Sequence, residues 1–225
     1  MTENPPKLQA VLFDMDGTLC ETEPAWMAAE QAIAARYGAT WTREDALALV
    51  GNDLIDAGTY MKARMDLPQT AEQVVEELVD RVVAEIAGHG VVWRPGAVEL
   101  LTACNDAGLP TALVTMSYDR FATAVVKALP AGRFDAIVTG ESVTRGKPAP
   151  DAYVLAADLL CVRAAATVAI EDSPPGAASA EAAGCTVVVV PNHVAVPPGP
   201  ARHRYESLLG MSLATLRELV GTPSS

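Results

Sequence analysis

Two aspartates, Asp14 and Asp16, lie two positions apart directly after the apolar run Ala10–Phe13. The run has the composition of a buried strand, and in an open parallel sheet ligands bind outside the carboxyl ends of the strands. Carboxylates this close repel each other, so one of them either stays protonated or shares a cation with its neighbour. The pair therefore predicts a site that combines a divalent metal ion with an acidic nucleophile.

Polar residues also follow a second apolar run, Thr111–Val114. A hydroxyl such as that of Thr115, and a free backbone N–H group in the turn with Met116, can hold phosphoryl oxygens at a strand end. Ser117 in the same turn is a candidate N-cap for the helix that follows. The two roles fall on different residues, so both are expected.

Lys147 and a second acidic pair complete the set of candidate residues. Lys147 stands just before an expected helix, where its ammonium group would neutralise a carboxylate nucleophile and a phosphoryl group. Glu171 and Asp172 follow the apolar run Thr167–Ile170. Magnesium takes one or two carboxylates and completes its octahedral shell with water, so these acids are candidate ligands.

The apolar runs that carry these residues predict an α/β fold. They are rich in Val, Ile and Leu without polar alternation, as in a sheet covered on both faces, and helical patterns separate the last four. This alternation indicates a doubly wound, Rossmann-like parallel sheet. A loop is expected over 191–202 and a closing helix over 212–220. The expected strands are Ala10–Phe13, Thr111–Val114, Asp135–Val138, Thr167–Ile170 and Thr186–Val190.

The stretch 20–90 differs from the rest because it has no good strand and carries helical periodicity throughout. Its ~70 residues exceed an ordinary crossover between strands. We therefore expect a helical cap domain at 20–90, inserted into a core domain formed by 1–19 and 91–225, with hinges near 20–23 and 88–94. The expected cap helices are Pro24–Tyr37, Arg43–Leu49, Asp53–Met65 and Ala71–Ala87.

Composition narrows the function classes. The chain has 225 residues, a formal net charge of -12 and 50% hydrophobic residues. This charge disfavours nucleic acid and anionic membranes as partners, and no apolar stretch reaches the ~18 residues of a membrane span. The N-terminus lacks a signal-peptide pattern, which predicts a cytoplasmic protein. The four cysteines lack the paired spacing of a zinc or dithiol site. The oligomeric state is left open, and a monomer is compatible with the sequence.

In order and setting, these segments resemble the four motifs of the haloacid dehalogenase-like (HAD) hydrolases, over nearly the whole chain. The Glu-Asp-Ser-Pro sequence that begins at Glu171 resembles the last motif of the beta-phosphoglucomutase-like phosphatases. The resemblance implies that Asp14 is the nucleophile, forming an aspartyl-phosphate, and that Asp16 is the general acid and base. It further implies phosphate binding by Lys147 and the turn after Thr111–Val114. Mg²⁺ would be held by Asp14, the Asp16 carbonyl and Asp172, with Glu171 bound through water or supporting a ligand.

The implied reaction is magnesium-dependent hydrolysis of a small phosphorylated metabolite, such as a sugar phosphate. The alternative is a phosphosugar mutase of the beta-phosphoglucomutase type. Two departures favour hydrolysis: Trp26 stands where such mutases commonly have histidine, and the stretch 49–54 has no basic residue to hold a second phosphate. Dehalogenases lack the second acid, here Asp16. Phosphonate cleavage would need a cap lysine, and Lys62 is the only one; phosphate-accepting receiver domains lack the helical insert.

Cap side chains are expected to choose the substrate. We expect a pocket with a narrow apolar wall and an acidic rim. The candidate pocket residues are Glu21, Glu23, Trp26 and Asn52.

Overall fold

The computed structural model describes residues 7–49 and 53–220. Its centre is a six-stranded sheet in the order β5-β4-β1-β6-β7-β8, and every neighbouring pair is parallel. All five expected strands are present, so the predicted parallel α/β sheet is confirmed. The strands are β1 (Ala10–Phe13), β4 (Thr111–Val114), β5 (Ala136–Val138), β6 (Thr167–Glu171), β7 (Thr186–Val189) and β8 (Arg202–Arg204).

The sixth strand, β8, corrects the sequence analysis, which expected a loop through residue 202. Its sequence Arg-His-Arg has no apolar run because it lies at the sheet edge and is not fully buried. Charged side chains at an edge strand also discourage pairing with another chain. A pattern search for buried strands therefore misses it.

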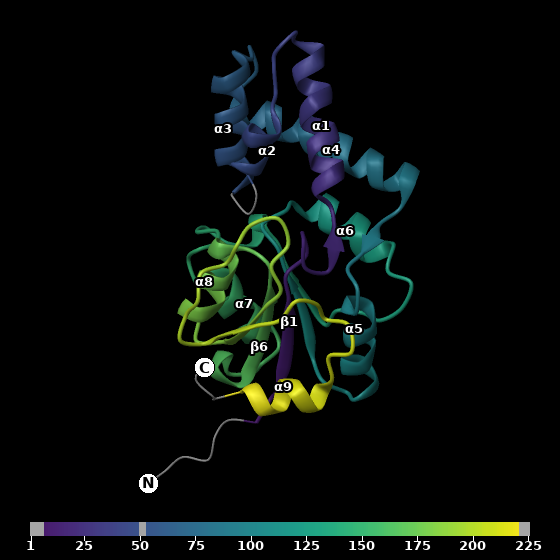
Figure 1. The fold of residues 1–225 in the computed structure, drawn as a ribbon, viewed down its shortest axis with the longest axis vertical. Coiled ribbons are helices and arrows are strands. Elements are labelled where there is room, and N and C mark those ends of the chain that lie inside the picture. Colours follow the sequence, from purple (N-terminus) through teal and green to yellow (C-terminus); the bar gives the residue numbers. More distant parts are fainter. Residues whose placement is uncertain (1–6, 50–52, 221–225) are drawn as a thin grey trace.

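The sheet is covered on both faces, and the alternation along β1 shows how. Val11 and Phe13 belong to one hydrophobic cluster, whereas Ala10 and Leu12 belong to the other. In Figure 1 the helices α7 and α8 lie on one side of β1 and α5 on the other. The core helices are α5 (Ala97–Asp106), α6 (Asp119–Lys127), α7 (Asp151–Leu159), α8 (Pro174–Ala182) and α9 (Leu213–Leu219).

The four described helices between β2 and β3 form a group above the carboxyl end of the sheet (Figure 1), as expected for a cap. The domain boundaries at 19 and 91 stay a prediction. No helix in the described part of the chain is both long and apolar enough to cross a membrane. The cap helices are α1 (Glu23–Arg36), α2 (Arg43–Leu47), α3 (Leu54–Met65) and α4 (Ala71–His89).

The two connections of the cap are paired, which the sequence analysis did not foresee. Strand β2 (Cys20–Glu21) runs antiparallel to β3 (Val92–Trp93), so the statement that 20–90 contains no strand is wrong at its first two residues. Two residues are too few to give a recognisable alternation. The expected hinge segments coincide with this small ribbon.

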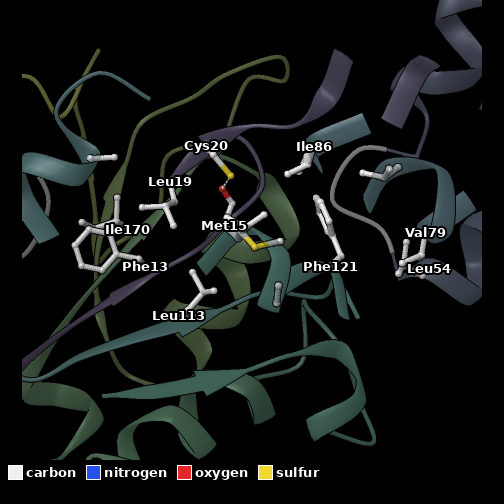
Figure 2. Packing of buried hydrophobic residues seen from close by; sticks show 14 of the residues in the cluster. Phe13, Met15, Leu19, Cys20, Leu54, Val79, Ile86, Leu113, Phe121 and Ile170 are labelled. Atoms are coloured by element: carbon white, nitrogen blue, oxygen red, sulfur yellow. Dashed lines mark hydrogen bonds between the residues drawn. The ribbon is translucent and has the colours of Figure 1, made fainter. Parts of the chain in front are cut away.

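One hydrophobic cluster runs from the sheet into the cap. Figure 2 shows Phe13 and Met15 near the end of β1, Phe121 on α6, and Val79 and Ile86 on α4. All five are buried members of this cluster. The cap therefore packs on the sheet through apolar contacts beside the strand ends. The polar residues after β1 lie next to these contacts, between the sheet and the cap.

Candidate active site

The candidate residues meet at one edge of the sheet because their strands are neighbours. Phe13 of β1 is in register with Leu113 of β4 and with Ile170 of β6, so the residues after these three positions lie close together. A cavity opens at this edge between the sheet and the cap. The predicted catalytic, phosphate-binding and metal-binding residues that line it are Asp14, Asp16, Thr115, Met116, Lys147 and Asp172.

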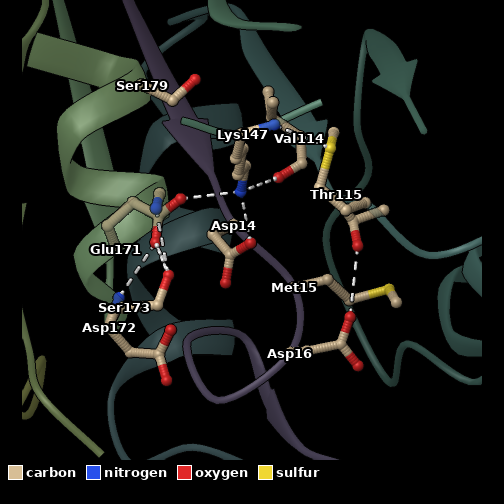
Figure 3. A network of polar contacts seen from close by, with 12 residues as sticks. Asp14, Met15, Asp16, Val114, Thr115, Lys147, Glu171, Asp172, Ser173 and Ser179 are labelled. Carbon is tan, nitrogen blue, oxygen red and sulfur yellow. Dashed lines mark hydrogen bonds and ion pairs between the residues drawn. The ribbon is translucent and has the colours of Figure 1, made fainter. Parts of the chain in front are cut away.

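Lys147 is the centre of the charged network (Figure 3). Its Nζ lies 2.7 Å from Asp14 Oδ1 and 2.7 Å from Glu171 Oε1, and it donates to the Val114 carbonyl at 2.9 Å. Its side chain is only 4% exposed. Burial opposes the lysine charge, but the two carboxylates outweigh it and raise the pKa of Lys147. Its ammonium group therefore stays charged beside the candidate nucleophile.

Asp14 and Asp172 carry more negative charge than their surroundings neutralise. Burial and the charge of Glu171 raise the pKa of Asp14 to about 7, although Lys147 opposes the shift. Burial and the charge of Asp14 likewise raise the pKa of Asp172. The Asp172 carboxylate accepts no hydrogen bond from the residues that the structure describes. Such a group is stable as an anion only beside a further positive charge.

The donor set fits a divalent cation. Oxygen atoms of Asp14, Glu171 and Asp172 all lie within 4.8 Å of one another. Carboxylate oxygens are the ligands that Mg²⁺ and Ca²⁺ prefer. The carboxylate of Asp172 belongs to this group and has no hydrogen-bond donor among the described residues. A bound cation would compensate its negative charge.

Glu171, the last residue of β6, has both carboxylate oxygens occupied by protein donors. Oε1 accepts from Lys147 and from Tyr153 Oη at 2.6 Å, and Oε2 accepts from Ser173 Oγ at 3.2 Å. A side chain at Gly176 would collide with this carboxylate, so α8 needs glycine there. Glu171 is therefore placed to hold Lys147 rather than to face the cavity.

Asp16 lies between the sheet and the cap. Its Oδ1 accepts from Thr22 Oγ1 at 2.6 Å and from Trp26 Nε1 at 3.2 Å, on the cap side. Its Oδ2 accepts from Thr115 Oγ1 at 3.2 Å and from Ser117 Oγ at 2.8 Å, on the sheet side. Four donors from both domains thus fix the orientation of this carboxylate.

The turn after β4 differs from one expectation. The Thr115 N–H group donates to the Val138 carbonyl at 2.9 Å, so it is not the free N–H group expected in this turn. Ser117 does not cap α6, whose N-cap is Tyr118 without a side-chain bond. Both hydroxyl groups instead face Asp16, which competes for them because a carboxylate accepts stronger hydrogen bonds than a neutral group.

The remaining pocket predictions divide. Glu23 and Trp26 line the cavity. Glu21 does not: its carboxylate accepts from Asn192 at 2.8 Å and contacts His193 at 3.1 Å. Burial opposes the shift, but these contacts lower the pKa of Glu21. Asn52 lies outside the described residues.

Several cavity residues were missed. Glu30 follows Glu23 and Trp26 at helical spacing on α1. Because such residues share one face of a helix, the sequence could have predicted that Glu30 lines the cavity with them. Asn192 and His193 follow β7, another strand that ends at the same sheet edge. Because ligands bind outside the carboxyl ends of parallel strands, their position could also have been predicted. The lining residues with polar side chains that the sequence analysis did not assign to the site are Thr22, Glu30, Ser117, Ser173, Asn192 and His193.

Comparisons with known proteins agree with this geometry. The sequence model of haloacid dehalogenase-like hydrolases matches residues 8–184. Hexitol phosphatase A of Escherichia coli K12 is 37% identical over 188 residues, covering 82% of this chain and 83% of that protein. The phosphorylated carbohydrates phosphatase of Thermotoga maritima is 30% identical, covering 79% of this chain and 82% of that protein. The relatives and the family match support the predicted phosphomonoester hydrolase.

Solved structures give the same assignment. CbbY from Rhodobacter sphaeroides in complex with phosphate has a TM-score of 0.83 at 30% identity, covering 93% of this chain and 99% of that one. A mutant of CbbY from the same organism, in complex with xylulose-(1,5)bisphosphate, has a TM-score of 0.81 at 29% identity, with the same coverage. The resemblance found in the sequence is confirmed, and the chain belongs to the haloacid dehalogenase-like hydrolase family.

Proposed function

We propose that this protein is a Mg²⁺-dependent phosphatase that hydrolyses a small phosphorylated sugar or polyol through an aspartyl-phosphate on Asp14. The observation that carries the proposal is the buried group of Asp14, Lys147 and Asp172 at the base of the cavity. Lys147 pairs with the nucleophile Asp14 there. The negative charge that remains on the carboxylates is what a divalent metal ion would neutralise. The names of the similar phosphatases support a carbohydrate phosphate as substrate.

In the first step, an Asp14 carboxylate oxygen attacks phosphorus, and the bond from phosphorus to the leaving oxygen breaks. Asp16 gives a proton to the leaving oxygen, which departs as an alcohol. In the second step, a water oxygen attacks the same phosphorus and passes a proton to Asp16. Asp14 is released with inorganic phosphate, so both groups return to their starting states.

The other site residues stabilise charge. Lys147 would contact the phosphoryl oxygens as well as Asp14, because its ammonium group lies beside that carboxylate. The backbone N–H of Met116 is proposed to bind a further phosphoryl oxygen, and so is the Thr115 hydroxyl once it turns from Asp16 to the bound substrate. Mg²⁺, held by Asp14, the Asp16 carbonyl and Asp172, would offset the negative charge shared by the carboxylates and the phosphoryl group.

Replacing Asp14 tests this function directly. Purified Asp14→Asn should lose turnover of 4-nitrophenyl phosphate by at least about 1,000-fold, because an amide is a poor nucleophile. Asp158→Asn, an exposed acid on α7, is the matched control and should keep full activity. Removing divalent ions with EDTA should stop turnover, and adding Mg²⁺ should restore it. Phosphate release that persists in Asp14→Asn would show that the nucleophile is wrongly assigned.

A further inference from the structure

The wall of the cavity opposite the nucleophile belongs to the cap, and its polar part comes from one face of α1. Glu23, Trp26 and Glu30 stand at positions i, i+3 and i+7, so they share that face. Trp26 is fixed by an edge-to-face contact with Phe121, at 5.2 Å between ring centroids. Apart from Thr22, the rest of the cap wall is apolar and consists of Ala46, Leu49, Leu54, Ala57 and Leu78.

The cap wall carries two acids, Glu23 and Glu30, and no described lysine or arginine of the cap lines the cavity beside them. Among the described residues that line the cavity, Lys147 is the only lysine or arginine, and it is engaged at the sheet end. Two cap cations are bonded elsewhere: Lys62 donates to the carbonyls of Leu67 and Gln69, and Arg64 pairs with Asp45. Arg43 is exposed and does not line the cavity. His193, which also lines the cavity, contacts Glu21.

Glu30 is the more deeply placed of the two acids. It is 4% exposed, and its Oε2 accepts from Trp41 Nε1 at 2.7 Å. Burial raises the pKa of Glu30 to about 7, with a smaller contribution from the charge of Glu23. Burial also raises the pKa of Glu23, although the charges of His193 and Arg43 oppose the shift. Near neutral pH the Glu30 carboxyl group can both accept and donate hydrogen bonds, which suits hydroxyl groups.

We infer that the leaving group is an uncharged, hydroxyl-bearing chain, so the substrate class is sugar or polyol monophosphates without a second phosphate or carboxylate. This inference rests on the proposed function and narrows it. Hydroxyl groups of the leaving group bond Glu23 and Glu30, while its carbon chain lies along the apolar wall. A second anion would be buried against two acids with no lysine or arginine beside it at that wall, a costly arrangement. In this preference for monophosphates the protein would differ from the CbbY mutant whose structure contains xylulose-(1,5)bisphosphate.

Matched substrate pairs test the inference. Fructose 6-phosphate and fructose 1,6-bisphosphate differ only in the second phosphate, and kcat/KM should be at least about 100-fold higher for the monophosphate. Glucose 6-phosphate should be turned over at least as well as glucosamine 6-phosphate. Equal rates within the first pair would overturn the inference. So would a preference of tenfold or more for the ammonium-bearing sugar, because the acids would then serve a cation.

Variants assign the selectivity to the cap wall. The double variant Glu23→Gln/Glu30→Gln should reduce the ratio of kcat/KM between the two fructose phosphates at least about tenfold, and Glu44→Gln, an exposed cap acid, should leave it unchanged. A ratio unaffected by the double variant would refute the role of these acids. Turnover of 4-nitrophenyl phosphate is measured in parallel. Its absence in the unaltered protein refutes the phosphatase itself, whereas its presence without substrate selectivity refutes only this inference.

Discussion

The buried acid Glu30 makes a specific prediction about the pH dependence of stability. In the folded protein its pKa is raised from 4.5 to about 7 by burial, to which the charge of Glu23 adds, while the bond from Trp41 opposes the shift. One pKa unit corresponds to 1.36 kcal/mol, so ionising Glu30 in the folded state costs about 3 kcal/mol more than in the unfolded chain. The unfolded state loses this proton first as the pH rises. Glu30 therefore lowers stability progressively between about pH 4.5 and pH 7.

Glu30→Gln removes this dependence while keeping an oxygen that accepts from Trp41. At pH 8 the variant should exceed the unaltered protein in free energy of unfolding by about 3 kcal/mol more than it does at pH 4.5. Urea denaturation at several pH values, followed by tryptophan fluorescence, measures the difference. Glu44→Gln should show no such trend, because that side chain is exposed in both states. A difference between Glu30→Gln and the unaltered protein that stays constant from pH 4.5 to 8 would refute the reasoning.

Two further substitutions test the site. Gly176→Ala places a methyl group against the Glu171 carboxylate; it should lower the free energy of unfolding by about 1–3 kcal/mol and reduce phosphatase activity. Gly88→Ala on α4, where a Cβ meets nothing within 4 Å, should instead stabilise the protein by about 0.5–1 kcal/mol in the same denaturation assay, and equal effects would contradict the collision. Asp16→Asn should slow alkyl phosphates more than aryl phosphates, because an alkoxide needs the proton more. Equal losses of kcat on both would argue against proton donation by Asp16.

Much of the fold could be predicted because its signals are local. The five buried strands are continuous apolar runs, and the four cap helices have clear breaks between them. The position of the candidate residues at one sheet edge followed from parallel pairing alone. By contrast, β8 and the β2–β3 pair are short or exposed, so burial imposes no recognisable pattern on them.

Contacts between residues far apart in the chain could not be predicted in the same way. The sequence analysis placed Thr115, Ser117 and Asp16 in or near the site but not the hydrogen bonds among them. Those bonds depend on the angle at which each turn leaves its strand. Glu21 and Glu23 likewise have the same chemistry and lie two positions apart, yet only Glu23 lines the cavity. The reason is that Glu21 lies in the ribbon and Glu23 begins α1.

The pairing of β2 with β3 determines how the cap could be exchanged with that of another protein. Cys20 is in register with Trp93, and Glu21 with Val92, so the two points at which the chain enters and leaves the cap form one seam. A transplanted cap joined outside this seam keeps the native register of both crossing points. A junction that shifts one of the two strands by a residue would turn its side chains to the opposite face of the ribbon.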